Sequence, residues 1–238
     1  MRFFQKSPAL SELREKTFVK RGDLIYTFID WLAYFPAKLF LFTKLTANQV
    51  TIIWIMGQLL SSLIALLGTK DYIFLSIFLF QSFFILDCTD GIIARYRKNF
   101  TLNGIYLDYV GHYISNPFFF ICVGIGVARY TQDIIYVLIG ILISFMFLLN
   151  KAITINPLWF SNASQREKVS NFSIVNPHKS VKKAIFVLFR VEYLFNIFFW
   201  LGLFGFVHYG LILYLFIFSL ELGRKMFNQF RQNMRANS

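Results

Sequence analysis

The stretch LDCTDGIIARYRKNFTLNGIYLDYVGH, residues 86–112, begins as the end of an apolar run but contains three aspartates, Asp87, Asp90 and Asp108. It ends in a histidine, His112. A carboxylate inside a membrane costs at least about 2.5 kcal/mol on insertion scales, and neighbouring carboxylates repel one another. We therefore expect something cationic to offset these charges, which a single nearby arginine cannot do.

If both halves of this stretch are helical, their polar and small residues form two stripes. The first stripe comprises Asp87, Asp90, Gly91, Ala94 and Arg95, at i, i+3, i+4, i+7 and i+8. The second comprises Gly104, Asp108 and His112, at i, i+4 and i+8. Such spacings put each stripe on one helix face. We expect the stripes to face each other near the cytoplasmic end of the membrane, where the small residues leave room for a bulky ligand or a close helix approach.

The composition predicts an integral membrane protein. Hydrophobic residues make up 57% of the 238-residue chain and charged residues only 15%, which is above the usual apolar share of soluble domains. Segments of the length needed to cross roughly 30 Å of hydrocarbon lie at 49–68, 72–86 running on to Arg95, 104–128, 134–150 and 184–222. The last segment is too long for one crossing, and we expect a break near Gly205 to His208. The predicted fold is therefore an all-α polytopic membrane protein with six transmembrane helices.

The distribution of charge predicts the orientation. The chain carries 24 Lys and Arg against 12 Asp and Glu, a net charge of +12. The basic residues gather on one side of the predicted spans, whereas the other side has only Lys70 and Arg129. By the positive-inside rule, we expect both termini, the 95–103 turn and the 151–182 loop to lie in the cytoplasm, with the protein in the inner (cytoplasmic) membrane. Because this rule accounts for the charge, nucleic acid is not an expected partner.

Residues 23–45 precede the first span and are aromatic and aliphatic, but they include four charged residues and Pro36. This composition favours an amphipathic helix that lies in the membrane interface. We therefore divide the chain into a cytoplasmic N-terminal segment with this helix (1–47), a six-helix membrane domain (48–225) and a basic cytoplasmic tail (226–238).

The acidic residues admit three interpretations. Oxygen-rich groups without cysteine or several histidines favour hard divalent ions such as Mg²⁺ or Mn²⁺, and two such ions form the clamp used for phosphoryl transfer. The acids could instead line the pathway of a cation-coupled transporter, or pair with basic residues at the membrane edge. Spacing alone leaves all three open.

The string Asp87-x-x-Asp90-Gly91-x-x-Ala94-Arg95, followed after eight residues by Gly104 and after three more by Asp108, resembles the signature of the CDP-alcohol phosphatidyltransferase family. Residues 45–51, LTANQVT, resemble the start of that family's first helix, with Ala47 where proline is usual. The resemblance spans residues from about 23 to 225. It implies a six-helix membrane enzyme of phospholipid or glycolipid synthesis, commonly a homodimer. Such an enzyme moves a substituted phosphate from a CDP-alcohol donor, here expected to be CDP-diacylglycerol, to an acceptor alcohol and releases CMP.

The resemblance also implies roles for individual residues. Asp87, Asp90 and Asp108 would hold the divalent ions, of which we expect two, Mg²⁺ or Mn²⁺. The CMP part of the donor would be bound by Asn48, Thr51, Asp87, Gly91, Ala94, Arg95 and Gly104. Candidate contacts for an anionic acceptor are Lys151, Arg166, Lys179 and Arg190. These four rest only on their basic character, which the positive-inside rule already explains.

His112 departs from the family pattern, which ends in a fourth aspartate taken as the general base for the acceptor hydroxyl. Histidine can do this task, because an ordinary pKa of about 6.5 leaves it largely neutral at pH 7. His112 could instead be a metal ligand or an orienting hydrogen-bond partner. A third interpretation is a catalytically inactive homologue that binds the CDP-alcohol without turnover.

Overall fold

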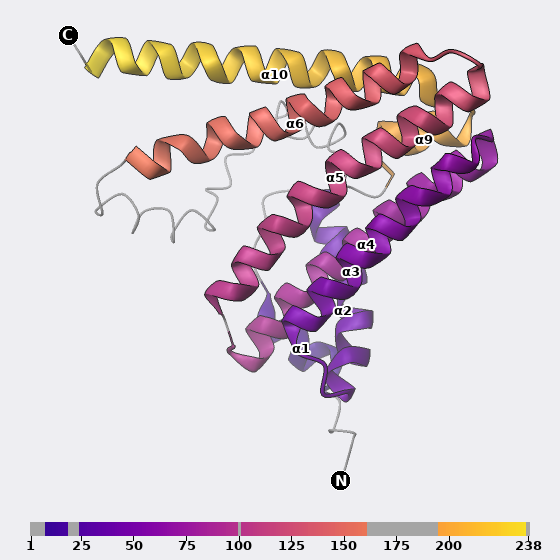
Figure 1. Cartoon of the computed structure of the whole chain (residues 1–238). Coiled ribbons are helices and arrows are strands. Elements are labelled where there is room, and N and C mark those ends of the chain that lie inside the picture. Colours follow the sequence, from indigo (N-terminus) through magenta and orange to yellow (C-terminus); the bar gives the residue numbers. More distant parts are fainter. Residues whose placement is uncertain (1–7, 19–23, 100, 161–194, 237–238) are drawn as a thin grey trace.

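The computed structural model describes residues 8–18, 24–99, 101–160 and 195–236. In this part of the chain every regular element is a helix, as predicted (Figure 1). The helices are α1 (Leu10–Thr17), α2 (Leu24–Phe42), α3 (Ala47–Ile64) with the short 3₁₀ turn η1 (Ala65–Leu67), α4 (Lys70–Arg97), α5 (Leu102–Thr131), α6 (Ile135–Phe160), α9 (Ile197–Leu203) and α10 (Val207–Ala236).

Threonine side chains cap the N-termini of three of the long helices. Thr46 forms a capping box with Gln49 ahead of α3, and Thr69 and Thr101 accept hydrogen bonds from the first turns of α4 and α5. Such caps satisfy backbone N–H groups that a helix start leaves without partners. α4 ends where Lys98 adopts a left-handed conformation, with φ of 50°. The turn from α4 to α5 is therefore short, and it follows the first acidic stripe directly.

Four helices in the described residues are long and apolar enough to cross a membrane: Ala47–Leu67, Lys70–Arg97, Leu102–Thr131 and Ile135–Ile153. These four confirm the first four predicted spans. The predicted break near Gly205 is also confirmed, since α9 ends at Leu203, Gly205 has a φ of +77°, and α10 begins at Val207. The fifth predicted span lies largely outside the described residues, so the count of six stays a prediction.

The predicted 151–182 loop was wrong for its first ten residues, because α6 continues as a helix to Phe160. The prediction ended the helix at Lys151, the first charge after an apolar run. A helix can carry such a charge where the side chain finds a partner, and Lys151 Nζ lies 5.3 Å from the centroid of the Phe147 ring. In addition, Asn150 donates a hydrogen bond to the carbonyl oxygen of Phe218 in α10. The remainder of the predicted loop, 161–182, lies outside the described residues.

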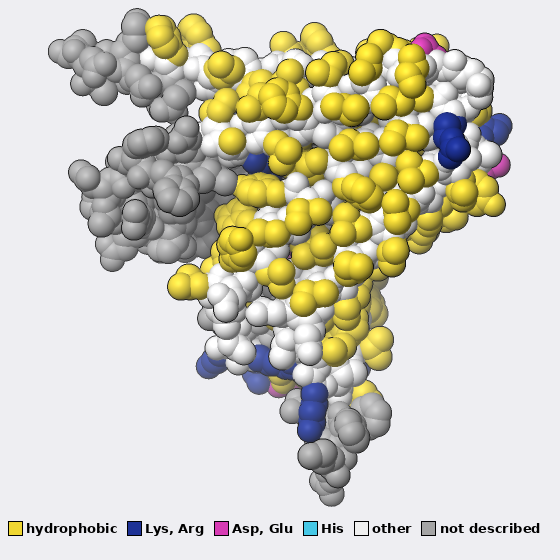
Figure 2. Space-filling model, in the orientation of Figure 1, with side chains coloured by type: hydrophobic (Ala, Val, Ile, Leu, Met, Phe, Trp, Pro, Cys, Tyr) yellow, Lys and Arg dark blue, Asp and Glu magenta, His cyan; other side chains and the backbone are white. Residues whose placement is uncertain are grey.

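α2 forms a helix over most of the predicted interfacial segment and contains Pro36 within it. Its placement in the membrane interface stays a prediction. The boundary predicted between residues 225 and 226 falls inside α10, which continues to Ala236. Figure 2 shows hydrophobic side chains over the long helices, with Lys and Arg gathered at the ends of the molecule.

Two hydrophobic cores hold the helices together. The larger core joins η1, α4, α5, α6, α9 and α10 around Phe80, Phe119, Phe198 and Tyr214, all fully buried. The smaller core packs α1 and α2 against the start of α3 and the C-terminal half of α4; its members include Leu13, Ile29, Ala33, Ile92 and Ile93. Because Asp87 to Arg95 lie on that half of α4, the smaller core sets the position of the acidic stripe against the N-terminal helices.

Candidate functional site

Asp87 on α4 and Asp108 and His112 on α5 form one group. Single ligand atoms from the three side chains all lie within 4.8 Å of one another. His112 Nε2 is 3.6 Å from Asp87 Oδ1 and 3.6 Å from Asp108 Oδ1. The side chains of Asp87 and His112 are 14% and 17% exposed and that of Asp108 is 42% exposed, so the group opens on the Asp108 side. The structure thus brings together residues of both predicted stripes.

Asp90 turns toward α3. Its Oδ2 accepts a hydrogen bond of 2.5 Å from the Thr51 hydroxyl and one of 3.1 Å from Trp54 Nε1. Thr51 is 3% exposed and Trp54 is fully buried. The group that contains Asp87 and Asp108 therefore has His112 as its third member. Asp90 instead forms hydrogen bonds with side chains of α3. That Asp90 binds a metal ion stays a prediction, as does contact between Thr51 and a nucleotide.

Trp54 links the two parts of the site. Its indole N–H donates to Asp90, and its ring centroid lies 5.0 Å from that of His112. Sequence reasoning did not single out this tryptophan. The available signal was its position one helical turn after Thr51, on the same face of the first predicted span. Gly111, one residue before His112, permits the contact, because a Cβ there would lie 2.7 Å from an atom of the Trp54 ring.

Two other glycines mark places where side chains approach the backbone closely. A Cβ on Gly104 would lie 2.8 Å from Asn48 Oδ1, so the structure brings these two predicted nucleotide contacts together. A Cβ on Gly91 would lie 3.3 Å from Arg95 Nη1, so the guanidinium folds back over Gly91. Ala94 lies half-buried on the same helix. The predicted nucleotide contacts thus come from α3, α4 and the first turn of α5.

The N-terminal helix α1 reaches the same end of α4. Arg95 Nε donates a hydrogen bond of 3.1 Å to the carbonyl oxygen of Thr17, the last residue of α1. The Tyr96 hydroxyl donates to Glu12 Oε1 at 3.2 Å, and Lys16 Nζ lies 2.7 Å from the same oxygen. The hydrogen bond from Lys16 lowers the pKa of Glu12, with a smaller contribution from Tyr96. Sequence reasoning missed these contacts, for which the pattern offered no signal.

Arg97 fixes the connection between α2 and α3. Its guanidinium donates to the carbonyl oxygen of Leu45 and, at 3.0 Å, to that of Thr43. Of the basic residues predicted as acceptor contacts, the structure describes only Lys151. Lys151 lies on α6 beside Phe147, and Arg166, Lys179 and Arg190 lie outside the described residues.

The donor set of the Asp87 group fits a divalent metal ion. The group offers two carboxylates, one imidazole nitrogen and no sulfur. The carboxylates favour hard ions such as Mg²⁺ and Mn²⁺, and the imidazole can also bind softer transition metals. The group is partly buried, so a cation would offset acids that would otherwise repel one another.

The family model described as CDP-alcohol phosphatidyltransferase matches residues 44–215. The match begins just before the capping box of α3 and includes Asp87, Asp90, Asp108 and His112, whereas the whole of α1 and α2 precedes it. No curated protein matches the sequence.

Proposed function

The chain belongs to the CDP-alcohol phosphatidyltransferase family, and from this premise we propose that it transfers a phosphatidyl group from CDP-diacylglycerol to an acceptor alcohol. The family consists of membrane phosphotransferases that act on CDP-alcohols in lipid synthesis, and the four long apolar helices agree with a multi-pass membrane protein. The observation that best supports the proposal is the group of Asp87, Asp108 and His112, formed where α4 and α5 face each other.

In this proposal Asp87 and Asp108, together with Asp90, would hold divalent ions, two Mg²⁺ or Mn²⁺. When bound, such ions polarise a phosphate and stabilise the charge that develops on it. The protein's own contribution at Asp90 is orientation. Because Thr51 and Trp54 both donate to Oδ2, they fix the rotation of that carboxylate.

The nucleotide half of the donor is proposed to bind beside Gly91 and Gly104. Neither residue has a side chain, and each lies against a polar group: Arg95 over Gly91, and Asn48 against Gly104. A guanidinium binds phosphate oxygens with strong charge-assisted hydrogen bonds, and an amide can both donate to and accept from a base or ribose. Arg95 is therefore the proposed phosphate contact and Asn48 a proposed contact for the nucleoside.

His112 is the proposed base. The acceptor oxygen would form a bond to the phosphorus that carries the lipid, the bridging P–O bond to CMP would break, and His112 would take the proton from the acceptor hydroxyl. Its position supports this role, because Nε2 lies 3.6 Å from one oxygen of Asp87 and 3.6 Å from one of Asp108, next to the proposed metal site where the phosphate would react. The same position also suits a metal ligand, so the two roles need separate measurements.

We further propose that the site opens to the cytoplasm, in the inner membrane, and that the enzyme is a homodimer, as the family resemblance implies. The orientation is supported by the basic residues near the connection between α4 and α5, which include Arg97 and Lys98.

The test is to incubate the purified protein with CDP-diacylglycerol and Mn²⁺, to offer polyols, sugar phosphates and serine separately, and to follow CMP. Release that requires both the metal and an acceptor is the expected result. A transporter would show no need for the nucleotide, and an inactive homologue would bind the CDP-alcohol without releasing CMP. Either outcome would contradict the proposal.

A further inference from the structure

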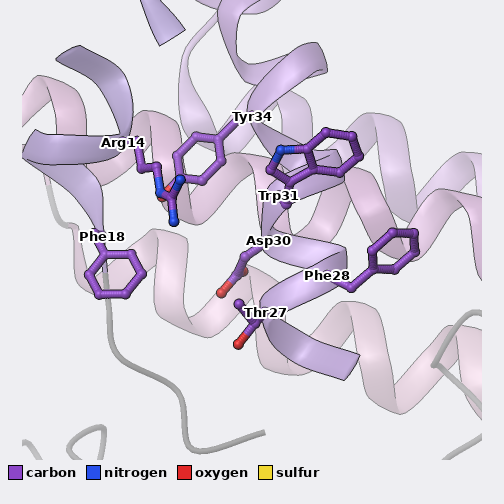
Figure 3. Close-up of a pocket in the computed structure, with 7 residues that line it drawn as sticks. All are labelled: Arg14, Phe18, Thr27, Phe28, Asp30, Trp31 and Tyr34. Carbon is purple, nitrogen blue, oxygen red and sulfur yellow. The ribbon is translucent and has the colours of Figure 1, made fainter. Parts of the chain in front are cut away.

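A pocket of about 290 Å³ lies between α1 and the first half of α2. Its lining includes Arg14 and Phe18 from α1 and Phe28, Asp30, Trp31 and Tyr34 from α2 (Figure 3). All of these residues precede the part of the chain that matches the family. The family reaction therefore assigns no role to this pocket.

The pocket combines aromatic walls with charges of both signs. Figure 3 shows the Arg14 guanidinium and the Asp30 carboxylate between the rings of Phe18 and Phe28, with Tyr34 and Trp31 above Asp30 in this view. The Arg14 guanidinium carbon lies 6.0 Å from the centroid of the Phe18 ring, within the range of a cation–π contact. Among the described residues, the lining combines aromatic rings with one cation and one anion, which suits a ligand that itself carries both charges.

The outer face of α2 leads away from the pocket as an apolar stripe. Phe28, Trp31, Phe35 and Leu39 follow one another at helical spacing and are 47%, 50%, 48% and 63% exposed. The opposite face of α2 is buried in the smaller core. Because the chain is a multi-pass membrane protein, lipid is the medium that covers such a stripe, and tryptophan together with phenylalanine is typical of the membrane interface.

We propose that this pocket binds the headgroup of a zwitterionic phospholipid, with the acyl chains along the exposed stripe of α2. The phosphodiester would accept hydrogen bonds from Arg14, whose planar guanidinium suits phosphate oxygens. The ammonium would lie near Asp30 and over the aromatic rings, which attract cations. A bound lipid would also contact Phe18, the residue after Thr17, and would thus support the end of α1 that contacts Arg95.

Trp31 is a direct reporter for this site. The purified protein is placed in vesicles of an uncharged glycolipid that contain a small fraction of a brominated lipid, either phosphatidylethanolamine or diacylglycerol. Bromine quenches tryptophan fluorescence on contact, and the difference between the wild type and Trp31→Phe isolates the signal of Trp31. Brominated phosphatidylethanolamine should quench Trp31 at a several-fold lower mole fraction than brominated diacylglycerol, and unlabelled phosphatidylethanolamine should relieve this quenching. Equal quenching of Trp31 by both brominated lipids would overturn the proposal.

Three further arms identify the groups involved. Arg14→Gln should remove the preference for phosphatidylethanolamine over diacylglycerol, whereas Lys44→Gln, which removes an exposed positive charge outside the pocket, should retain it. If both variants kept the preference for phosphatidylethanolamine over diacylglycerol, the proposed role of Arg14 would be wrong. Competition by phosphatidylglycerol equal to that by phosphatidylethanolamine would exclude the zwitterionic headgroup. Relief of quenching by inorganic phosphate or glycerophosphoethanolamine alone would show a site for a soluble phosphate instead of a lipid.

Discussion

Arg95 Nε donates a hydrogen bond to the carbonyl oxygen of Thr17 at 3.1 Å and so joins two residues that are 78 positions apart. Arg95 belongs to the acidic stripe of α4, whereas Thr17 ends α1 and is 2% exposed. The carbonyl at the C-terminus of a helix carries partial negative charge and favours a cation. The N-terminal helix, which lies outside the family match, therefore helps to orient a residue of the proposed donor site.

We expect Tyr96→Phe to raise KM for the CDP-alcohol by about two- to fivefold with little change in kcat. The substitution removes the hydroxyl that donates to Glu12, and a single partly exposed hydrogen bond makes only a small net contribution. Since α1 then holds Arg95 less firmly, binding of the donor weakens before chemistry does. Steady-state CMP release at varied donor and varied acceptor measures the effect. A rise confined to the acceptor KM would refute the assignment.

Helix α1 should become less stable at acidic pH. The hydrogen bond from Lys16 within α1 lowers the pKa of Glu12 below its value in the unfolded chain, with a smaller contribution from Tyr96 of α4, so the ionised carboxylate favours the α1 helix above the unfolded pKa, about 4.3. This contribution is lost as the pH falls through the lower folded pKa. Amide hydrogen exchange in α1, corrected for intrinsic rates, should therefore accelerate on acidification. Glu12→Gln should remove this pH dependence of the exchange rate. If the exchange rate of Glu12→Gln depended on pH as it does in the wild type, another group would be responsible.

Asp87→Asn and Asp108→Asn should each lower the rate of CMP release by at least about a hundredfold, equivalent to roughly 2.7 kcal/mol in the barrier. Both substitutions preserve volume but remove a charge from the group that brings three ligand atoms within 4.8 Å. A chelator should likewise abolish release in the wild type, and added Mn²⁺ or Mg²⁺ should restore it.

The matching measurement is Mn²⁺ binding by electron paramagnetic resonance in the absence of substrate. Weaker binding in both variants is expected. If Asp87→Asn binds Mn²⁺ normally and retains release within about threefold of the wild type, a barrier change of only about 0.7 kcal/mol, Asp87 is not a ligand.

Hydropathy was sufficient to locate the long helices, because a membrane requires about twenty apolar residues for each crossing. Gly205 was sufficient to locate the break between α9 and α10, because its φ of +77° suits glycine. The end of α6 was less predictable. Lys151 marks a change in composition, but its contact with Phe147 depends on packing that a linear pattern does not contain.

In the candidate site, too, the sequence predicted which residues share a helix face but not how the helices pack against each other. Helical spacing placed Asp87 and Arg95 on one face of α4, and it placed Asp108 and His112 on one face of α5. It could not determine that Asp90 faces Thr51 and Trp54, since this depends on the rotation of α3 relative to α4. The docking of α1 was equally inaccessible, because a hydrogen bond to the backbone carbonyl of Thr17 requires no particular side chain there.

Trp54→Phe should lower the rate of CMP release by about tenfold or more. The substitution keeps a ring near His112 but removes the N–H that donates to Asp90 at 3.1 Å, and a hydrogen bond to a charged group contributes about 1.5–3 kcal/mol. The control is a double-mutant cycle with Asp90→Asn. If Trp54 acts by orienting Asp90, its substitution should have little further effect in the Asp90→Asn background. Independent, additive losses would mean that Trp54 has a separate role.

His112→Ala tests the final residue of the opening stretch, where base and metal ligand are the competing roles. If His112 is the base, turnover should fall by about a hundredfold or more, in line with general-base contributions. The affinity for Mn²⁺ and for the CDP-alcohol should stay near that of the wild type, because the carboxylates of Asp87 and Asp108 are unchanged. If His112 is instead a ligand, Mn²⁺ affinity should fall together with turnover.

His112→Asp separates these roles further. Aspartate is the residue that the family pattern has at this position, so a base role predicts partial recovery of CMP release relative to His112→Ala. Its carboxylate is shorter than the imidazole, whose Nε2 lies 3.6 Å from each of the two neighbouring aspartates, and recovery should therefore remain incomplete. Near-normal release by His112→Ala would make His112 a bystander. The proton of the acceptor hydroxyl would then have to pass to water, to the phosphate or to a different side chain.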